Sequence, residues 1–210
     1  MPLQNRVTPL GEIIADPARG TLMGNRGILH DRDRKLGRSR WKHKAWIACV
    51  LAFRSRRRAP MAPGRYTELF FLDEATALAA GHRPCAECRC ADFNAYRAAW
   101  ATAHDLDAPP SAKAMDDALH AHRVEPRQRE QGHHTRTALD IPDGAFVLVD
   151  GDAWLVWKRR LLRWSASGYD RVGELPGTLL TVVTPKPSVD ALAAGYRVAV
   201  HDSGSDLVGN

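Results

Sequence analysis

The chain has 210 residues and a formal net charge of +6 at pH 7, with a sequence pI near 9.4. Hydrophobic residues make up 44% and charged residues 26%, which is ordinary for a globular protein and excludes disordered and collagen-like classes. No apolar run approaches the roughly 20 residues that a membrane span needs, and the segment that starts at Met1 lacks the pattern of a secretory signal. We therefore expect a cytoplasmic protein with no membrane partner.

The first half of the chain alternates short strands with helices. Frequent Pro and Gly in the first thirty residues predict loops and short strands. Asp73 is placed to cap a helix that Gly81 ends. The expected elements are strands over Trp46–Phe53 and Tyr66–Leu72, a short helix over Glu74–Ala80, and a longer helix from about Ala86 to His104.

The second half becomes rich in strands after a joint at Pro109-Pro110-Ser111. We expect a helix over Ala114–His122 and a flexible excursion over Glu125–Thr137. Turn signals separate the next segments. They predict strands over Ala145–Val149, Ala153–Trp157, Leu161–Trp164 and Thr178–Thr184, a helix over Ser188–Ala194, a last strand over Tyr196–Val200 and a tail over Ser203–Asn210.

These elements predict an α+β fold. An α/β module over residues 1–108 would carry a basic patch, and residues 109–140 would connect it to a β-rich, barrel-like lobe over residues 141–202, with a tail over 203–210. No internal repeat is present in the sequence.

The positive charge is concentrated in one window. Eleven Lys and Arg between Arg32 and Arg58 stand against a single acid, Asp33, so this window carries +10 and the rest of the chain −4. A concentrated patch suits a polyanion, because neutralising phosphates releases counterions. The alternative is a solvated loop and the polar face of a strand.

We expect nucleic acid, DNA more than RNA, to bind this patch. Trp41 lies within it and could stack on bases, and an Asn and an Arg in the Gly-rich segment Met23–Gly27 could contact a base or phosphate. The candidate nucleic-acid-binding residues are Asn25, Arg26, Arg38, Arg40, Trp41, Lys42, Lys44, Arg54, Arg56, Arg57 and Arg58.

The strongest chemical motif is the C-x-x-C pair of Cys85 and Cys88 at the start of the predicted second helix. Two thiolates at this spacing can converge on one tetrahedral ion, and helix N–H groups favour ionised sulfur. The four cysteines of the chain are too few and too clustered for a disulfide scaffold. A redox pair is the alternative.

The segment Phe70–Arg89 resembles the metal-binding module at the N-terminus of the Ada DNA-repair protein and related zinc modules of nuclease- and competence-type proteins. The shared pattern is an aromatic strand, an Ala-rich helix, a Gly turn, Arg-Pro and the cysteine pair. The chain as a whole resembles a bacterial protein family of similar length, and that second resemblance implies no mechanism.

The resemblance implies a structural zinc site completed by two upstream ligands. In the related modules these are a His after a Gly/Asn/Ser-rich strand and then a single Cys, which places the zinc ligands at His30, Cys49, Cys85 and Cys88. His82 competes for the fourth place, although the family has an aromatic there. The Ada module has a C-x-x-x-C pair upstream, which this chain lacks, and this argues against methyl transfer.

Other residues are catalytic candidates for a nuclease- or glycosylase-type enzyme. Asp116, His120 and Arg123 share one face of the predicted helix and could perform acid–base chemistry, or they could form a surface ion-pair ladder. Glu68 is a candidate if its carboxylate faces inward.

The leading function is therefore a zinc-containing DNA-binding protein of repair or processing. The alternatives are an enzyme that cleaves nucleic acid or a nucleotide, and a protein-interaction module with structural zinc. A fold-level resemblance does not establish chemistry.

Overall fold

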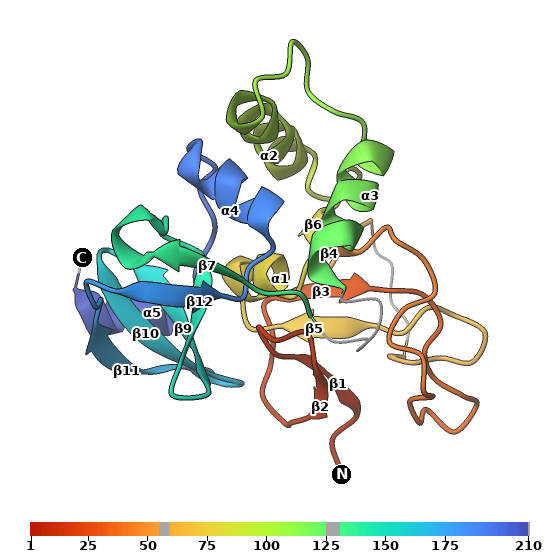
Figure 1. Cartoon of the computed structure of the whole chain (residues 1–210). Coiled ribbons are helices and arrows are strands. Elements are labelled where there is room, and N and C mark those ends of the chain that lie inside the picture. Colours follow the sequence, from red (N-terminus) through yellow and green to blue (C-terminus); the bar gives the residue numbers. More distant parts are fainter. Residues whose placement is uncertain (55–58, 125–130, 210) are drawn as a thin grey trace.

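The computed structural model describes residues 1–54, 59–124 and 131–209. Two six-stranded sheets lie side by side in these residues, with one short helix between them (Figure 1). The α+β prediction is confirmed. The barrel-like lobe is wrong, because the second sheet ends at two unjoined edge strands and remains open.

The first sheet comes from the N-terminal half, in the order β2-β1-β5-β3-β4-β6. Most neighbours are antiparallel, but β1 runs parallel to β5, and β4 runs parallel to β6. Its strands are β1 (Gln4–Val7), β2 (Ile13–Ala15), β3 (Leu22–Asn25), β4 (Ile47–Val50), β5 (Leu69–Phe71) and β6 (Arg83–Pro84).

The second sheet is antiparallel, in the order β11-β10-β9-β8-β12-β7. Tight turns at Asp150-Gly151 and Lys158-Arg159, all with positive φ, join β8, β9 and β10. The strands are β7 (His134–Thr137), β8 (Phe146–Val149), β9 (Asp152–Trp157), β10 (Arg160–Ser165), β11 (Gly168–Glu174) and β12 (Leu179–Val182).

The helix α1 (Glu74–Ala79) is buried on every residue and belongs to the cores of both sheets. Asp73 caps it, as predicted, by accepting from the main-chain N–H and the hydroxyl of Thr76 at 2.8 and 2.7 Å. The mostly small side chains of this helix let the two sheets approach it closely. Gly81, at φ 81°, then reverses the chain.

Three helices form a layer beside α1 (Figure 1). In α2 (Cys90–Ala103) Phe93, Tyr96 and Trp100 are buried at helical spacing. Ser111 caps α3 (Ala112–Arg123) through the N–H of Ala114. The helix α4 (Lys186–Ala193) packs on both, and a 3₁₀ turn covers Ala138–Asp140.

The last twenty residues differ most from the prediction. Tyr196–Val200 does not form a strand, because its polar groups bond to a buried carboxylate instead. The Ala199 N–H and the Tyr196 hydroxyl both donate to Glu74. The expected tail instead contains the helix α5 (Asp202–Val208), which packs against β11.

Part of the predicted flexible excursion is also ordered. Residues 134–137 form β7, which pairs with β12 along four residues of each strand.

Candidate functional site

Three cysteines meet at one end of the first sheet. Cys49 lies on β4, and Cys85 and Cys88 lie in the turn between β6 and α2. The parallel pairing of β4 with β6 brings them together, and the Cys85 N–H donates to the carbonyl of Ala48 at 3.0 Å. The three sulfurs lie within 4.8 Å of one another.

The electrostatics of the cluster single out Cys85 as the first thiol to ionise. The hydrogen bond from the Cys49 thiol lowers the pKa of Cys85 most, and main-chain N–H groups of Cys88 and Glu87 lower it further against the effect of burial. The same Cys49–Cys85 hydrogen bond, with burial, raises the pKa of Cys49. Burial raises the pKa of Cys88.

This donor set fits a soft tetrahedral cation. Sulfurs on one zinc ion at about 2.3 Å each lie about 3.8 Å apart, so the thiols need only small shifts to converge. Within residues 1–54, 59–124 and 131–209, no fourth His, Cys, Asp or Glu joins the group. The three cysteines could therefore hold a metal and supply three of its ligands.

The structure does not bring His30 to the three thiols. Its ring is buried, with Nδ1 at 2.7 Å from the hydroxyl of Thr67 and Nε2 at 3.3 Å from the carbonyl of Ala62. The carbonyl of Ala62 can only accept, so Nε2 carries the proton of the neutral ring and the Thr67 hydroxyl donates to Nδ1, while its oxygen accepts the N–H of Leu29. Both ring nitrogens of His30 therefore make hydrogen bonds that tie it to the segment containing Ala62 and Thr67.

His82, the other candidate for the fourth place, and the remaining cysteine also lie away from the three thiols. His82 is fully buried against the rings of Phe71 and Trp46, and its Nε2 accepts from Arg26 Nε at 3.4 Å. Cys90 is exposed at the start of α2 and lies within 3.5 Å of the Asn94 amide.

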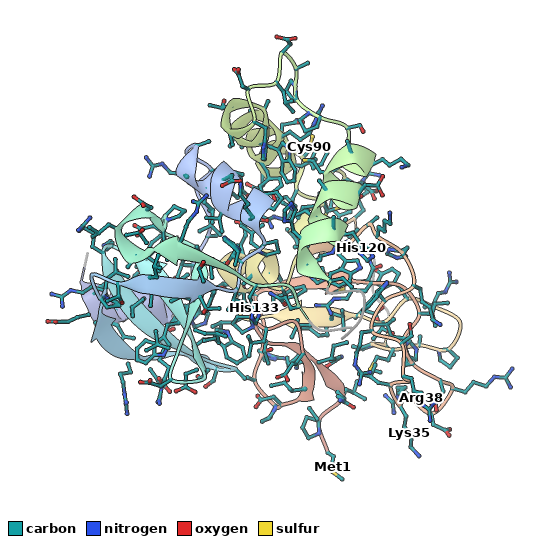
Figure 2. All side chains as sticks on the ribbon, in the orientation of Figure 1. Met1, Lys35, Arg38, Cys90, His120 and His133 are labelled. Atoms are coloured by element: carbon teal, nitrogen blue, oxygen red, sulfur yellow. The ribbon has the colours of Figure 1, made fainter. Side chains whose placement is uncertain are left out.

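The long loop from Arg26 to Trp46 carries every described cation of the basic window except Arg54. Figure 2 shows Lys35 and Arg38 on its outer bend. Arg38, Arg40 and Lys42 are exposed, whereas Lys44 pairs with Asp117 at 2.9 Å.

Further along the chain, Arg54 is the one cationic candidate that the structure describes, and it is exposed. Arg54 pairs with Glu87 at 3.5 Å. Arg56, Arg57 and Arg58 lie outside the described residues.

A cavity of about 430 Å³ opens beside this loop. Arg26, Arg40, Trp41 and Trp46 line it together with Arg123, the last residue of α3. Asn25 is buried at the end of β3 and is not among the residues that line it.

The three candidate residues on α3 (Asp116, His120 and Arg123) do not act as one group in the structure. The Asp116 carboxylate accepts two hydrogen bonds from Arg83, at 2.9 and 2.8 Å, in a buried ion pair. Arg123 lies instead in the cavity, with its Nη2 at 3.5 Å from His120 Nδ1. Burial, followed by the charges of Arg123 and Lys44, lowers the pKa of His120.

Glu68 is buried, as the catalytic hypothesis requires, but its carboxylate supports a loop. Its Oε2 accepts the main-chain N–H of Met61 at 2.7 Å, where Met61 has φ 57°. The carboxylates of Glu68 and Asp116 thus both make contacts that hold the fold. Glu68 lies directly before β5 and not on α3, and the Asp116 carboxylate is engaged by Arg83.

The stacking of two arginines on Trp46 was not predicted. The guanidinium carbon of Arg26 lies 4.1 Å from the ring centroid of Trp46, and that of Arg123 lies 3.9 Å away. Since 77 residues separate Trp46 from Arg123, no local pattern could have indicated this contact.

No family model, curated protein or solved structure matches this chain. Among the described helices, none combines the length and apolar character that crossing a membrane requires.

Proposed function

We propose that this chain is a zinc-containing nucleic-acid-binding protein that acts on DNA in repair or processing. The observation that carries the proposal is the exposed basic loop. Six of its cations form no ion pair with any described carboxylate, and all are exposed: Arg32, Arg34, Lys35, Arg38, Arg40 and Lys42. Unpaired exposed cations on one loop suit a phosphate backbone.

Cys49, Cys85 and Cys88 would hold the zinc ion. A structural zinc ion supplies a cross-link, here between β4 and the turn before α2. Cys49 lies on β4, which directly follows the basic loop. The zinc cross-link would therefore hold one end of the DNA-binding surface in place.

The binding test is a titration of fluorescein-labelled duplex and single-stranded DNA at several salt concentrations. We expect affinity to fall steeply with salt. Combining Arg38→Gln, Arg40→Gln and Lys42→Gln should reduce the slope of log affinity against log salt by about one for each phosphate that the variant no longer neutralises. Combining Arg160→Gln and Arg171→Gln on the second sheet, as the control, should leave the slope unchanged. If the protein shows no salt-dependent affinity for DNA, the protein-interaction alternative is favoured.

The metal test is native mass spectrometry of protein purified without chelator. We expect one zinc ion per chain, absent from Cys49→Ser and retained in Cys90→Ser, because the Cys90 thiol is outside the cluster. His30→Ala separates the geometry from the family resemblance: retention of zinc agrees with the hydrogen bonds of His30, and loss agrees with ligation. A metal-free parent protein would overturn the zinc part of the proposal.

A further inference from the structure

The cavity beside the basic loop is formed by segments from both halves of the chain. The residues that line it lie in the turn after β1, at the start of β4, at the end of α3 and in the turn that joins β8 to β9. Figure 2 labels His120 at the end of α3 and His133 on the segment leading into β7, and His133 also lines the cavity. Its volume of about 430 Å³ is within the range of roughly 300–1,000 Å³ typical of small-ligand pockets.

Two buried guanidinium groups line this cavity without a carboxylate partner among the described residues. Arg26 donates to the carbonyls of Gly11 and Ala80 and to His82. Arg123 donates to the carbonyls of Gly81, at 2.6 Å, and Lys44. The buried Nε of Arg123 has no hydrogen-bond partner in the part of the chain that the structure describes.

The carboxylates of the described residues do not neutralise this pair. Asp116, the acid whose charge acts most on Arg123, is already held by Arg83. Glu12 lines the cavity but is exposed. Burial is the largest effect on both guanidinium groups and lowers the pKa of Arg26 and of Arg123 to about 9, so both remain charged at neutral pH.

Two buried cations that no described carboxylate pairs with are costly, and a bound anion offsets that cost. An Arg pair also matches the geometry of phosphate oxygens. Stacking on Trp46 fixes the positions of both guanidinium groups before any ligand arrives.

An aromatic surface stands beside the cations. Trp41 is half-buried, lines the cavity and contacts the rings of Trp46 and His120 at centroid distances of 6.1 and 5.8 Å. A second hollow, lined by Arg38 and Ser39, shares Arg40 and Trp41 with the cavity. The exposed basic loop therefore leads directly to the cavity.

We propose that this cavity binds one nucleotide unit, with its phosphate beside Arg26 and Arg123 and its base stacked on Trp41. The inference rests on the proposed function, because the basic loop would deliver a DNA strand to the cavity. The phosphate and base of a free nucleotide have the same chemistry, so the experiment includes both sources.

The test is isothermal titration of the full-length protein with dTMP, thymidine and inorganic phosphate, beside anisotropy titration of a labelled single-stranded 12-mer. The variants are Arg123→Gln, Trp41→Ala and Arg40→Gln, with Arg160→Gln as the control. Arg123 also holds main-chain carbonyls, so circular dichroism checks the fold of its variant. The residues Trp41 and Arg40 lie at the surface and keep the test decisive if Arg123→Gln does not fold.

We expect dTMP to bind more tightly than phosphate or thymidine, because only dTMP engages both the cations and the ring. Trp41→Ala should weaken binding of dTMP and of the 12-mer by about tenfold, the effect of losing one stacked base. Arg160→Gln should change neither. Binding of dTMP without binding of the 12-mer would support the cavity and overturn the proposed DNA function. Binding of the 12-mer that is insensitive to Trp41→Ala, with no binding of dTMP, would overturn the cavity and leave the DNA function, which rests on the cations of the basic loop, standing.

Discussion

At the scale of single residues, the buried ion pair of Arg83 and Asp116 predicts an asymmetry between neighbouring acids. Asp116→Asn removes the charge that Arg83 pairs with and leaves a buried guanidinium uncompensated, so we expect a loss of about 3 kcal/mol in the free energy of unfolding. Asp117, next in sequence, pairs with Lys44 and Lys113 at the surface. Asp117→Asn should leave the free energy of unfolding unchanged, since solvent screens such surface pairs.

Urea unfolding of both variants measures this difference. Equal stability of Asp116→Asn and the parent protein would show that the Asp116 carboxylate is free for the chemistry that the sequence suggested.

His82 predicts how the stability of the fold depends on pH. Burial, reinforced by the charges of Arg26 and Arg123, holds the pKa of His82 well below its ordinary value, so the folded protein keeps this ring neutral. The unfolded chain takes up a proton there below about pH 6.5, and protonation therefore favours unfolding as pH falls. The loss approaches about 1.4 kcal/mol per pH unit below that point.

His82→Phe keeps a ring between Phe71 and Trp46 and removes the titrating group. Its free energy of unfolding should fall less steeply than that of the parent between pH 6.5 and 5. The pKa values of His120 and His134 are also lowered by burial, and these residues contribute to both proteins, so the difference in slope belongs to His82. Identical slopes would contradict the buried neutral ring.

The predictable part of the candidate site is the part with a local signal. The C-x-x-C spacing indicated a pair of metal-binding thiols, the resemblance to the zinc modules added Cys49, and the three sulfurs do lie together. The partners of Asp116 and Arg123 came from β6 and the basic loop, far away in sequence. Helical periodicity shows which residues share a face, but not what that face meets.

At the scale of elements, local sequence rules predicted a helix or strand correctly where capping or turn residues mark its ends. Asp73 and Gly81 bound α1, and the turn residues at Asp150-Gly151 mark the start of β9. The rules failed over Tyr196–Val200, whose apolar residues alternate as in a strand, because Glu74 accepts the N–H of Ala199 and Asp73 accepts the N–H of His201 directly after the segment. Such competition is visible only in three dimensions.

The helix α5 predicts that the end of the chain contributes to stability. The Ser203 hydroxyl accepts the N–H of Tyr169 at 2.9 Å, and the buried Gly204 packs so closely that an added Cβ would lie 3.0, 3.2 and 3.3 Å from the side chains of Val200, Tyr169 and Leu162. A chain that ends at His201 cannot form these interactions and leaves the Tyr169 N–H without its acceptor. We expect it to be about 2 kcal/mol less stable.

Thermal and urea unfolding compare this truncation with a chain that ends at Val208 and keeps α5. This control removes only Gly209 and Asn210 and should match the parent. If the truncation at His201 also matches the parent, the segment is the tail that its composition suggested.

At the scale of the whole molecule, the two sheets depend on one another through α1. Leu78 belongs to the larger core beneath the second sheet, and Ala77 belongs to the core of the first. The acids that begin this helix hold distant parts of the chain: Asp73 accepts from the Tyr169 hydroxyl at 2.7 Å, and Glu74 pairs with Arg89 at 2.7 Å. The cavity lies across the same junction, so its shape requires both halves.

This arrangement predicts that the second sheet does not fold alone. A fragment of residues 131–210 contains all six of its strands, yet it lacks α1 and the carboxylates that fix residues 196–201. Its apolar face would be exposed to water, and the buried Tyr169 hydroxyl would lose its acceptor. We expect poor dispersion in its amide NMR spectrum, and the full chain should unfold in a single transition by tryptophan fluorescence and circular dichroism. A well-dispersed spectrum of the fragment, or two separate transitions of the full chain, would show instead that the lobe beyond residue 141 is an independent domain.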